Sequence, residues 1–334
     1  MARRRQLTTR STSPATADDT QHVTERVRFA RARSGASSAP STVSAASAAS
    51  ASAAAASAGT AEVRCAVGDL TAVVHVSGAD APDVVVVLVH GVGSSARAFD
   101  PVRRALLRPG ALPRVAVHAI DLPGFGAAPR APRDVSIEEH AAVVAEHVRR
   151  HVLDLPDGAP RPVVVLVGHS MGAQVVAQAM ADHPREAPAG VLVGPTADRH
   201  ARSAPRQALR LARDAVGERP RALATLAVDY VLRCSLPHYA RQVRHMLAHR
   251  LEDVVPHVPG RLVVVRGALD PIAPRRWCRE LALAAPRGMF REVRGRHHAM
   301  DADPEGIVAA VRDAGGLPRG LPRDLPQGLP RDLP

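Results

Sequence analysis

Residues 162–183 read PVVVLVGHSMGAQVVAQAMADH, and this stretch decides the fold. An unbroken run of valine and leucine leads up to Gly168, which is the pattern of a strand buried on both faces. A helical, mostly apolar run begins directly after Ser170. Glycines at 168 and 172 leave room beside the serine, as a tight turn from strand to helix requires. The segment therefore predicts a serine hydroxyl raised above the end of a buried strand.

The same alternation of strand and helix extends in both directions from this turn. The sequence predicts strands at 61–67, 71–76, 83–90, 114–120, 162–167, 191–193, 261–266 and 290–293. It predicts helices at 96–107, 136–152, from Ser170 onward, 274–285 and 304–314. Strands that alternate with helices predict an α/β fold with a mostly parallel eight-stranded sheet and helices on both faces.

Three segments do not follow this alternation. Residues 1–60 are rich in Arg, Ser and Ala and have little periodicity, so we expect a disordered N-terminal segment. Residues 317–334 repeat Leu-Pro every four residues, which favours an extended, disordered tail. Residues 197–257 are helical in pattern and Arg-rich. They lie between two predicted strands, and we expect a helical lid inserted into a domain that spans 61–316.

Four motifs give the sequence a family resemblance over roughly residues 61–314. The serine turn, GHSMG, has the form G-x-S-x-G of a nucleophile elbow. The other three follow predicted strands in the family's order: LVHGVGSS at 88–95, DLPGFG at 121–126 and GALD at 267–270. The chain thus resembles the α/β-hydrolase superfamily. The resemblance implies the α/β-hydrolase fold and a serine hydrolase whose triad runs in the order Ser, acid, His.

The predicted nucleophile and acid are Ser170 and Asp270. A serine hydroxyl becomes a good nucleophile only when a base accepts its proton. A carboxylate orients that base and stabilises its cationic form. Asp270 follows a predicted strand, so it should lie at the sheet edge near Ser170. Two alternatives stay open: Asp270 could simply cap a helix before Pro271, and Asp198, after the preceding strand, could be the acid.

The base is ambiguous between two neighbouring histidines. Counting forward from the strand end at Val293 and Gly295, the family pattern indicates His298. Counting back from Pro304, it indicates His297. We favour His298, because a strand end fixes the register more rigidly than a loop of variable length, and keep His297 as the alternative base.

Two backbone N–H groups should form the oxyanion hole. The N–H of Met171, which follows the nucleophile at the start of a helix, is the first. The family resemblance implies Val92 as the second. Gly168, His169 and Gly172 complete the predicted nucleophile elbow, and we expect His90 to support the loop before Val92.

The predicted function is a cofactor-independent serine hydrolase that cleaves an ester, thioester or lactone of a small-molecule acyl substrate. Acyl transfer and carbon–carbon bond hydrolysis on the same triad are alternatives, as is a non-catalytic ligand-binding homologue. Serine at the nucleophile position argues against epoxide or haloalkane hydrolysis, for which relatives use aspartate. The sequence has no C-x-x-C, no H-E-x-x-H and no His together with Cys at zinc spacing, so we expect no metal and no cofactor.

Charge and composition bear on partners and location. The net charge of +12 comes mainly from residues 1–34 and 199–250. No nucleic-acid reading module accompanies that charge, so we expect no nucleic-acid partner. No apolar run reaches the ~18 residues of a membrane helix. Three widely spaced cysteines indicate a reducing compartment, and we expect a cytoplasmic protein. The sequence leaves the oligomeric state open.

Overall fold

The computed structural model describes residues 60–215 and 236–318 of the 334-residue chain. The predicted disordered segment at the N-terminus lies outside the described residues, apart from residue 60. All but the first two residues of the predicted Leu-Pro tail also lie outside them. The central part of the predicted lid, residues 216–235, is likewise not described.

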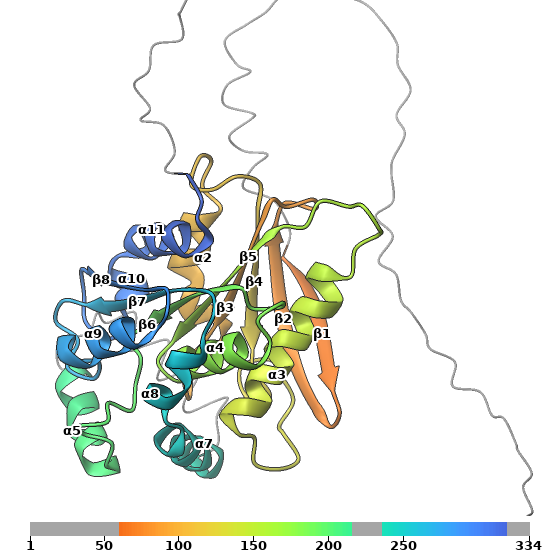
Figure 1. Cartoon of the computed structure of the whole chain (residues 1–334). Coiled ribbons are helices and arrows are strands. Elements are labelled where there is room, and N and C mark those ends of the chain that lie inside the picture. Colours follow the sequence, from red (N-terminus) through yellow and green to blue (C-terminus); the bar gives the residue numbers. More distant parts are fainter. Residues whose placement is uncertain (1–59, 216–235, 319–334) are drawn as a thin grey trace, which may run out of the picture. The chain divides into compact units, whose positions relative to one another are not determined.

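Eight strands form one sheet, which confirms the predicted α/β architecture (Figure 1). In spatial order they are β1 (Ala61–Val67), β2 (Leu70–Gly78), β4 (Val115–Asp121), β3 (Val84–Val89), β5 (Val163–His169), β6 (Ala189–Val193), β7 (Arg261–Gly267) and β8 (Gly288–Val293). The strand β2 is antiparallel to both of its neighbours, and all other pairs are parallel. The carboxyl ends of the parallel strands therefore share one edge, where open α/β sheets bind their ligands.

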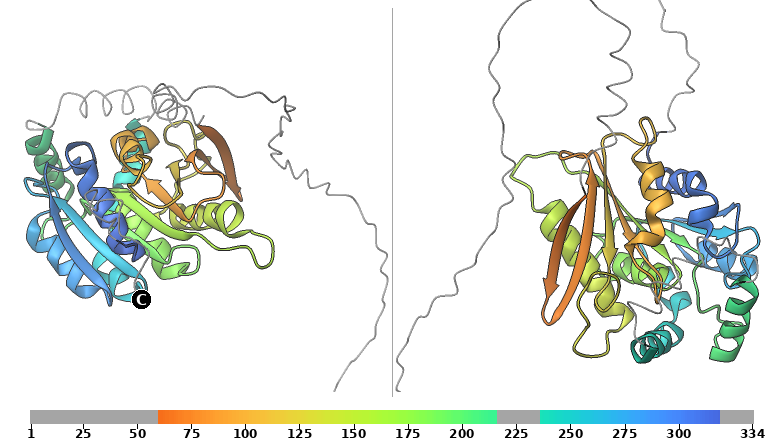
Figure 2. Two further views of the ribbon diagram at one scale, coloured as in Figure 1. Left: turned by 90° about the horizontal axis from the view of Figure 1, so that it is seen from above. Right: turned by 180° about the vertical axis from the view of Figure 1, so that it is seen from behind.

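Helices cover both faces of the sheet, as Figures 1 and 2 show. One face packs against α3 (Ile137–Val148), α4 (Met171–Asp182), α8 (Leu251–Val254) and α9 (Arg275–Ala284). The other packs against η1 (Ala96–Phe99), α2 (Asp100–Leu106), α10 (Ala299–Ala302) and α11 (Pro304–Gly315). Each face has its own apolar core, so strands in the middle of the sheet are buried on both sides.

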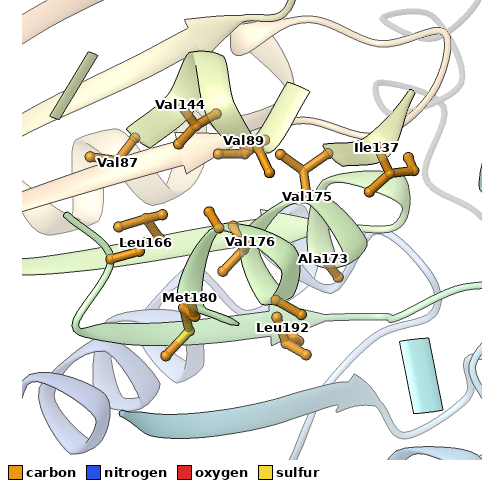
Figure 3. Packing of buried hydrophobic residues seen from close by; sticks show 14 of the residues in the cluster. Val87, Val89, Ile137, Val144, Leu166, Ala173, Val175, Val176, Met180 and Leu192 are labelled. Carbon is orange, nitrogen blue, oxygen red and sulfur yellow. The ribbon is translucent and has the colours of Figure 1, made fainter. Parts of the chain in front are cut away.

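The unbroken valine run of β3 illustrates this double burial. Its side chains alternate between the two cores, with Val87 and Val89 on the α3–α4 side and Val86 on the other. Figure 3 shows Val87 and Val89 beside Val144 of α3 and Val176 of α4. A strand with one solvent-exposed face would show alternating polar residues instead.

The helix α3 begins as the sequence predicts but ends differently. The Ser136 Oγ accepts a hydrogen bond from the Glu139 N–H at 3.2 Å, and the Glu139 Oε2 accepts one from the Ser136 N–H at 2.8 Å. This reciprocal pair is a capping box. Beyond Val148 the chain continues as one π-helical turn, η2 (Arg149–Leu153). Such turns widen the helix by one residue and often occur at functional sites.

Helices also fill the described part of the segment between β6 and β7. They are α5 (Ala204–Ala215), α7 (Leu236–Ala248), α8 and η4 (Val255–His257). The guanidinium of Arg210 on α5 lies 2.9 Å from the Asp198 carboxylate, and that of Arg202 lies 2.5 Å from the Glu252 carboxylate. These two arginines are thus held by acids of the same segment. A role of these helices as a lid stays a prediction.

None of the helices in the described residues is long and apolar enough to span a membrane.

A buried histidine on α3 makes folding pH-dependent. The His140 Nε2–H donates to the Gln242 Oε1 at 3.2 Å, and burial lowers the pKa of His140 from 6.5 to about 4. The unfolded chain therefore binds a proton between these pH values that the folded chain does not, so stability falls as pH falls. We expect this one group to lower the free energy of unfolding by about 2 kcal/mol between pH 7 and pH 5.

Urea unfolding of the wild type and of His140→Gln at both pH values measures this effect. The variant should lose that part of the pH dependence, whatever its stability at pH 7. An identical pH dependence in the two proteins would contradict the assignment to His140.

Candidate active site

Ser170 stands alone between the end of β5 and the start of α4. Its backbone has φ +58° and ψ −117°, a region that side-chain-bearing residues rarely occupy and that costs about 1–3 kcal/mol. Two backbone hydrogen bonds hold it there. The Ser170 N–H donates to the Val193 carbonyl at 3.0 Å, and its own carbonyl accepts from the Ala173 N–H at 3.1 Å. The turn therefore holds the serine at the carboxyl edge of the sheet, as the sequence predicts.

The glycines beside Ser170 permit three backbone segments to meet. A Cβ atom on Gly168 would lie 2.1 Å from the carbonyl oxygen of Gly172, and one on Gly172 would lie 2.2 Å from that of Val89. Neither distance is compatible with a side chain. The loop after β3 also approaches closely, because a Cβ on Gly91 would lie 2.9 Å from the Ser170 Cβ. The two predicted sources of oxyanion donors therefore flank the serine.

The predicted oxyanion donors lie in these two segments. Met171 is the first residue of α4 and is fully buried, while Val92 is partly buried and follows Gly91. In the backbone hydrogen bonds of the described residues, neither N–H donates to another part of the chain. Both are therefore free of competing backbone carbonyls, as an oxyanion donor must be.

Asp270 lies at the end of a short turn after β7, and its carboxylate is buried. One oxygen, Oδ1, accepts hydrogen bonds from the N–H groups of Ile272 (2.7 Å) and Ala273 (2.9 Å). The other, Oδ2, lies 3.0 Å from Nδ1 of His297. The carboxylate thus supports its own turn and also binds a histidine. It does not cap the following helix α9, whose N-cap residue is Pro274.

Of the two candidate bases, the structure places His297 rather than His298 against Asp270. His297 is buried, and its imidazole is fixed by the Asp270 carboxylate. His298 is partly exposed and precedes α10. Its ring lies 5.6 Å from that of His297, centroid to centroid. The geometry therefore favours His297, the alternative base, over His298, which the sequence analysis preferred.

The alternative acid, Asp198, is committed to other partners. Its Oδ1 accepts from the His200 N–H at 3.0 Å, and its Oδ2 lies 2.9 Å from the Arg210 guanidinium. Asp198 therefore forms an ion pair within the segment between β6 and β7, and the structure brings Asp270, not Asp198, to His297.

His169, the residue before the nucleophile, positions the predicted base. Its Nε2–H donates to the backbone carbonyl of His297 at 3.1 Å. Complete burial, with smaller effects from His297 and His298, keeps the pKa of His169 well below its usual value. A neutral His169 has the N–H that this bond requires and adds no positive charge next to Ser170.

Two of the motif residues hold loops together. The His90 Nδ1–H donates to the Gly91 carbonyl at 2.8 Å, and its Nε2 accepts from the Leu122 N–H at 3.1 Å. The Asp121 Oδ1 accepts from the Ala96 N–H at 2.7 Å. These bonds join the loop after β3 to the loop after β4 and fit the supporting role expected of His90.

Three residues around the Asp270–His297 pair were not identified from the sequence. The Asp214 Oδ1, on α5, accepts from the His297 N–H at 3.3 Å. The Arg266 guanidinium donates to the Asp270 carbonyl at 3.0 Å. A Cβ on Gly194 would lie 3.1 Å from both the Asp270 Oδ2 and the His297 Nδ1. Of these three, only Arg266 is suggested by the sequence, since it is a charged residue that directly follows the apolar run of a predicted strand.

Comparisons with known proteins agree with this architecture. The profile described as "Alpha/beta hydrolase family" matches residues 86–310. A search of curated protein sequences gives no significant match. Among the described residues, the one group of potential metal ligands is Cys65, His147 and His151, which lie on β1, α3 and η2.

Solved structures with a similar fold include three bacterial enzymes. A hydrolase from Pseudomonas aeruginosa PA01 superposes with a TM-score of 0.61 at 16% identity, over 76% of this chain and 98% of that one. The enol-lactonase from Burkholderia xenovorans LB400 gives 0.60 at 20% identity, over 75% and 98%. A thermophilic esterase from Thermogutta terrifontis gives 0.58 at 19% identity, over 77% and 97%. At these identities the comparisons establish a shared fold.

Proposed function

The chain belongs to the alpha/beta hydrolase family, and from this we propose that it is a cofactor-independent serine hydrolase. Its substrate would be a small-molecule ester, thioester or lactone, cleaved through an acyl-enzyme on Ser170. The proposal takes Asp270 as the acid and His297 as the base. A cytoplasmic location is part of the same proposal and rests on the sequence alone.

The observation that carries the proposal is the buried hydrogen bond between Asp270 and His297 at the sheet edge that also holds Ser170. Because the His297 Nδ1–H donates to the carboxylate at 3.0 Å, the neutral ring has its proton on Nδ1. The lone pair on Nε2 is then the basic site. A carboxylate in this position also stabilises the imidazolium formed when the base takes a proton.

The first half of the reaction would acylate Ser170. The Ser170 Oγ attacks the acyl carbon while the His297 Nε2 accepts the hydroxyl proton. The resulting oxyanion would be stabilised by the N–H groups of Met171 and Val92. The tetrahedral intermediate then collapses as the carbon–oxygen or carbon–sulfur bond to the leaving group breaks. His297 returns its proton to the leaving alcohol or thiol, and the acyl group stays on Ser170.

The second half would release the acid by the same groups. A water molecule replaces the departed alcohol or thiol and gives a proton to the His297 Nε2 as its oxygen attacks the acyl carbon. The intermediate collapses with cleavage of the bond to Ser170 Oγ, which recovers its proton from His297. Of the similar folds, one is described as an enol-lactonase and another as an esterase. Both descriptions fit the proposed substrate class.

The test is covalent labelling together with ester hydrolysis. The purified full-length chain is treated with a fluorophosphonate probe, beside Ser170→Ala, and assayed on nitrophenyl esters of graded acyl length. We expect labelling that disappears in Ser170→Ala, and turnover with a preferred chain length. A folded wild type that is neither labelled nor active on any ester would contradict the proposal and favour a ligand-binding role.

Adding an alcohol or amine acceptor to the same assay separates hydrolysis from acyl transfer. For a hydrolase, the acceptor should leave the free acid as the main product. An ester or amide of the acceptor as the main product would instead favour an acyltransferase with the same Ser170 chemistry.

Replacing the acid is expected to reduce turnover strongly. In Asp270→Asn the Oδ1 position can still accept from Ile272 and Ala273, so the turn should persist. The amide would then present an N–H to the His297 Nδ1 and favour the wrong tautomer. We expect kcat on a nitrophenyl ester to fall about ten-thousandfold. The matched control is Asp198→Asn, which alters an ion pair with Arg210 and should leave most activity. The reverse ranking of the two variants would make Asp198 the acid.

A further inference from the structure

A second cluster of reactive side chains lies at the far edge of the sheet from Ser170. Cys65 on β1, His147 on α3 and His151 on η2 have ligand atoms that all lie within 4.8 Å of one another. Four strand spacings separate β1 from β5 in the sheet, about 19 Å at the usual spacing. The cluster is therefore distinct from the proposed active site.

Cys65 and His147 come from different elements but lie on the same side of the sheet. Cys65 faces the α3 side of the sheet, because its antiparallel partner Ala72 belongs to that core. His147 is in the last turn of α3, and His151 lies four residues later in the π-helical turn. The two imidazole rings are 5.1 Å apart at their centroids and inclined by only 30°. Cys65 and His147 are buried, whereas His151 is exposed, so the cluster opens to solvent on one side.

His147 has one ring nitrogen without a partner. Its Nε2 lies 2.9 Å from Nδ1 of His118, on β4. Its Nδ1 is buried and makes no hydrogen bond in the described part of the chain. A buried polar atom without a hydrogen-bond partner destabilises the folded state, and a bound ligand at Nδ1 would remove that cost.

The bond to His118 suits a metal ligand. An imidazole that binds a metal through Nδ1 keeps its proton on Nε2 and usually donates it to a fixed acceptor, which sets the tautomer and the ring orientation. The lone pair of the His118 Nδ1 can be that acceptor. His147 is thus held for coordination by a second residue that does not belong to the ligand set.

We propose that Cys65, His147 and His151 form a binding site for a zinc ion, with the fourth position open to water. One thiolate and two imidazoles are a ligand set that zinc accepts, in tetrahedral geometry with four ligands. Soft sulfur together with imidazole nitrogen disfavours magnesium and calcium, which take oxygen ligands. The spacing H-x₃-H at 147–151 falls within the range found in zinc sites.

Arg150 on η2 contacts the strand β1 next to Cys65. Its Nη1–H donates to the Ala66 carbonyl at 3.1 Å, beside Cys65. A zinc ion here would join the edge strand β1 to the end of α3, so we infer a mainly stabilising role.

Cobalt provides an optical test, because Co²⁺ occupies zinc sites and a thiolate ligand gives it a charge-transfer absorption. The full-length chain is freed of metal with a chelator and titrated with Co²⁺, and Zn²⁺ is then added. We expect one equivalent of Co²⁺ to give the thiolate band, Zn²⁺ to abolish it, and Zn²⁺ to raise the Tm of the wild type.

Variants assign the band to this cluster. Cys65→Ser should abolish it, while Cys278→Ser, at another buried cysteine, should keep it. His118→Phe removes only the acceptor and should weaken Co²⁺ binding about 10- to 100-fold. His151→Ala changes an exposed residue and should lower the affinity at least as much, which keeps the test valid if Cys65→Ser does not fold. The absence of a thiolate band in the wild type, or a band unchanged in Cys65→Ser or His151→Ala, would overturn the proposal.

Discussion

Replacing Ser170 by alanine is expected to lower kcat on the preferred nitrophenyl ester by about a millionfold, the size of loss found when a serine nucleophile is removed from a triad. The change deletes one oxygen atom from a residue that is already buried. Alanine inherits the strained backbone of the turn, so the deletion relieves no strain. The oxyanion donors are backbone groups and stay in place, so KM should change far less than kcat.

The matched control is Ser136→Ala, which removes a serine hydroxyl at the N-terminus of α3. That variant should lose about 1 kcal/mol of stability and keep its activity. Circular dichroism and the Tm establish that both variants are folded. Turnover by Ser170→Ala comparable to that of the wild type would show that Ser170 is not the nucleophile, whatever the labelling result.

The strands could be predicted because each carries its own signal. Continuous valine and leucine runs identified β3 and β5 without any knowledge of their neighbours. The first and last residues of the strands were less clear from the sequence. The sequence predicts a strand over 191–193, whereas β6 begins at Ala189, because Ala189 and Gly190 pair with Arg261 and Leu262 of β7. Such pairing overrides weak local preference.

The end of α3 could not be predicted from the sequence, for a different reason. The apolar spacing over 136–152 is helical throughout, and the chain does stay helical to Leu153. The change from an α-helical to a π-helical turn after Val148 leaves no trace in that spacing. This change helps to set where His151 lies relative to Cys65, so the metal-ligand cluster was not apparent from the sequence.

The candidate site likewise has one part that local sequence determines and another part that contacts between distant segments determine. The serine turn is local, and its glycines are required by contacts within a few residues of Ser170 or with the adjacent strand. The partner of Asp270 depends instead on how the loop after β8 is anchored. The Leu269 N–H donates to the Gly295 carbonyl at 3.0 Å, which ties the two loops together. Neighbouring histidines point in different directions from such a loop, and counting along the chain cannot choose between them.

The two histidines can be separated by kinetics. His297→Ala is expected to lower kcat by about a millionfold, as loss of the base does in a triad that works as a unit. His298→Ala should change kcat by about tenfold or less, because His298 is partly exposed and the structure gives Asp270 to its neighbour. Both variants are measured on the same ester, with the Tm as the check on folding.

The size of the His297 effect also tests whether Ser170, His297 and Asp270 act together. In a working triad, adding Ser170→Ala to His297→Ala should lower kcat little further, because removal of either group already disables the same step. Independent contributions would instead multiply. A large loss in His298→Ala with near-normal turnover in His297→Ala would make His298 the base.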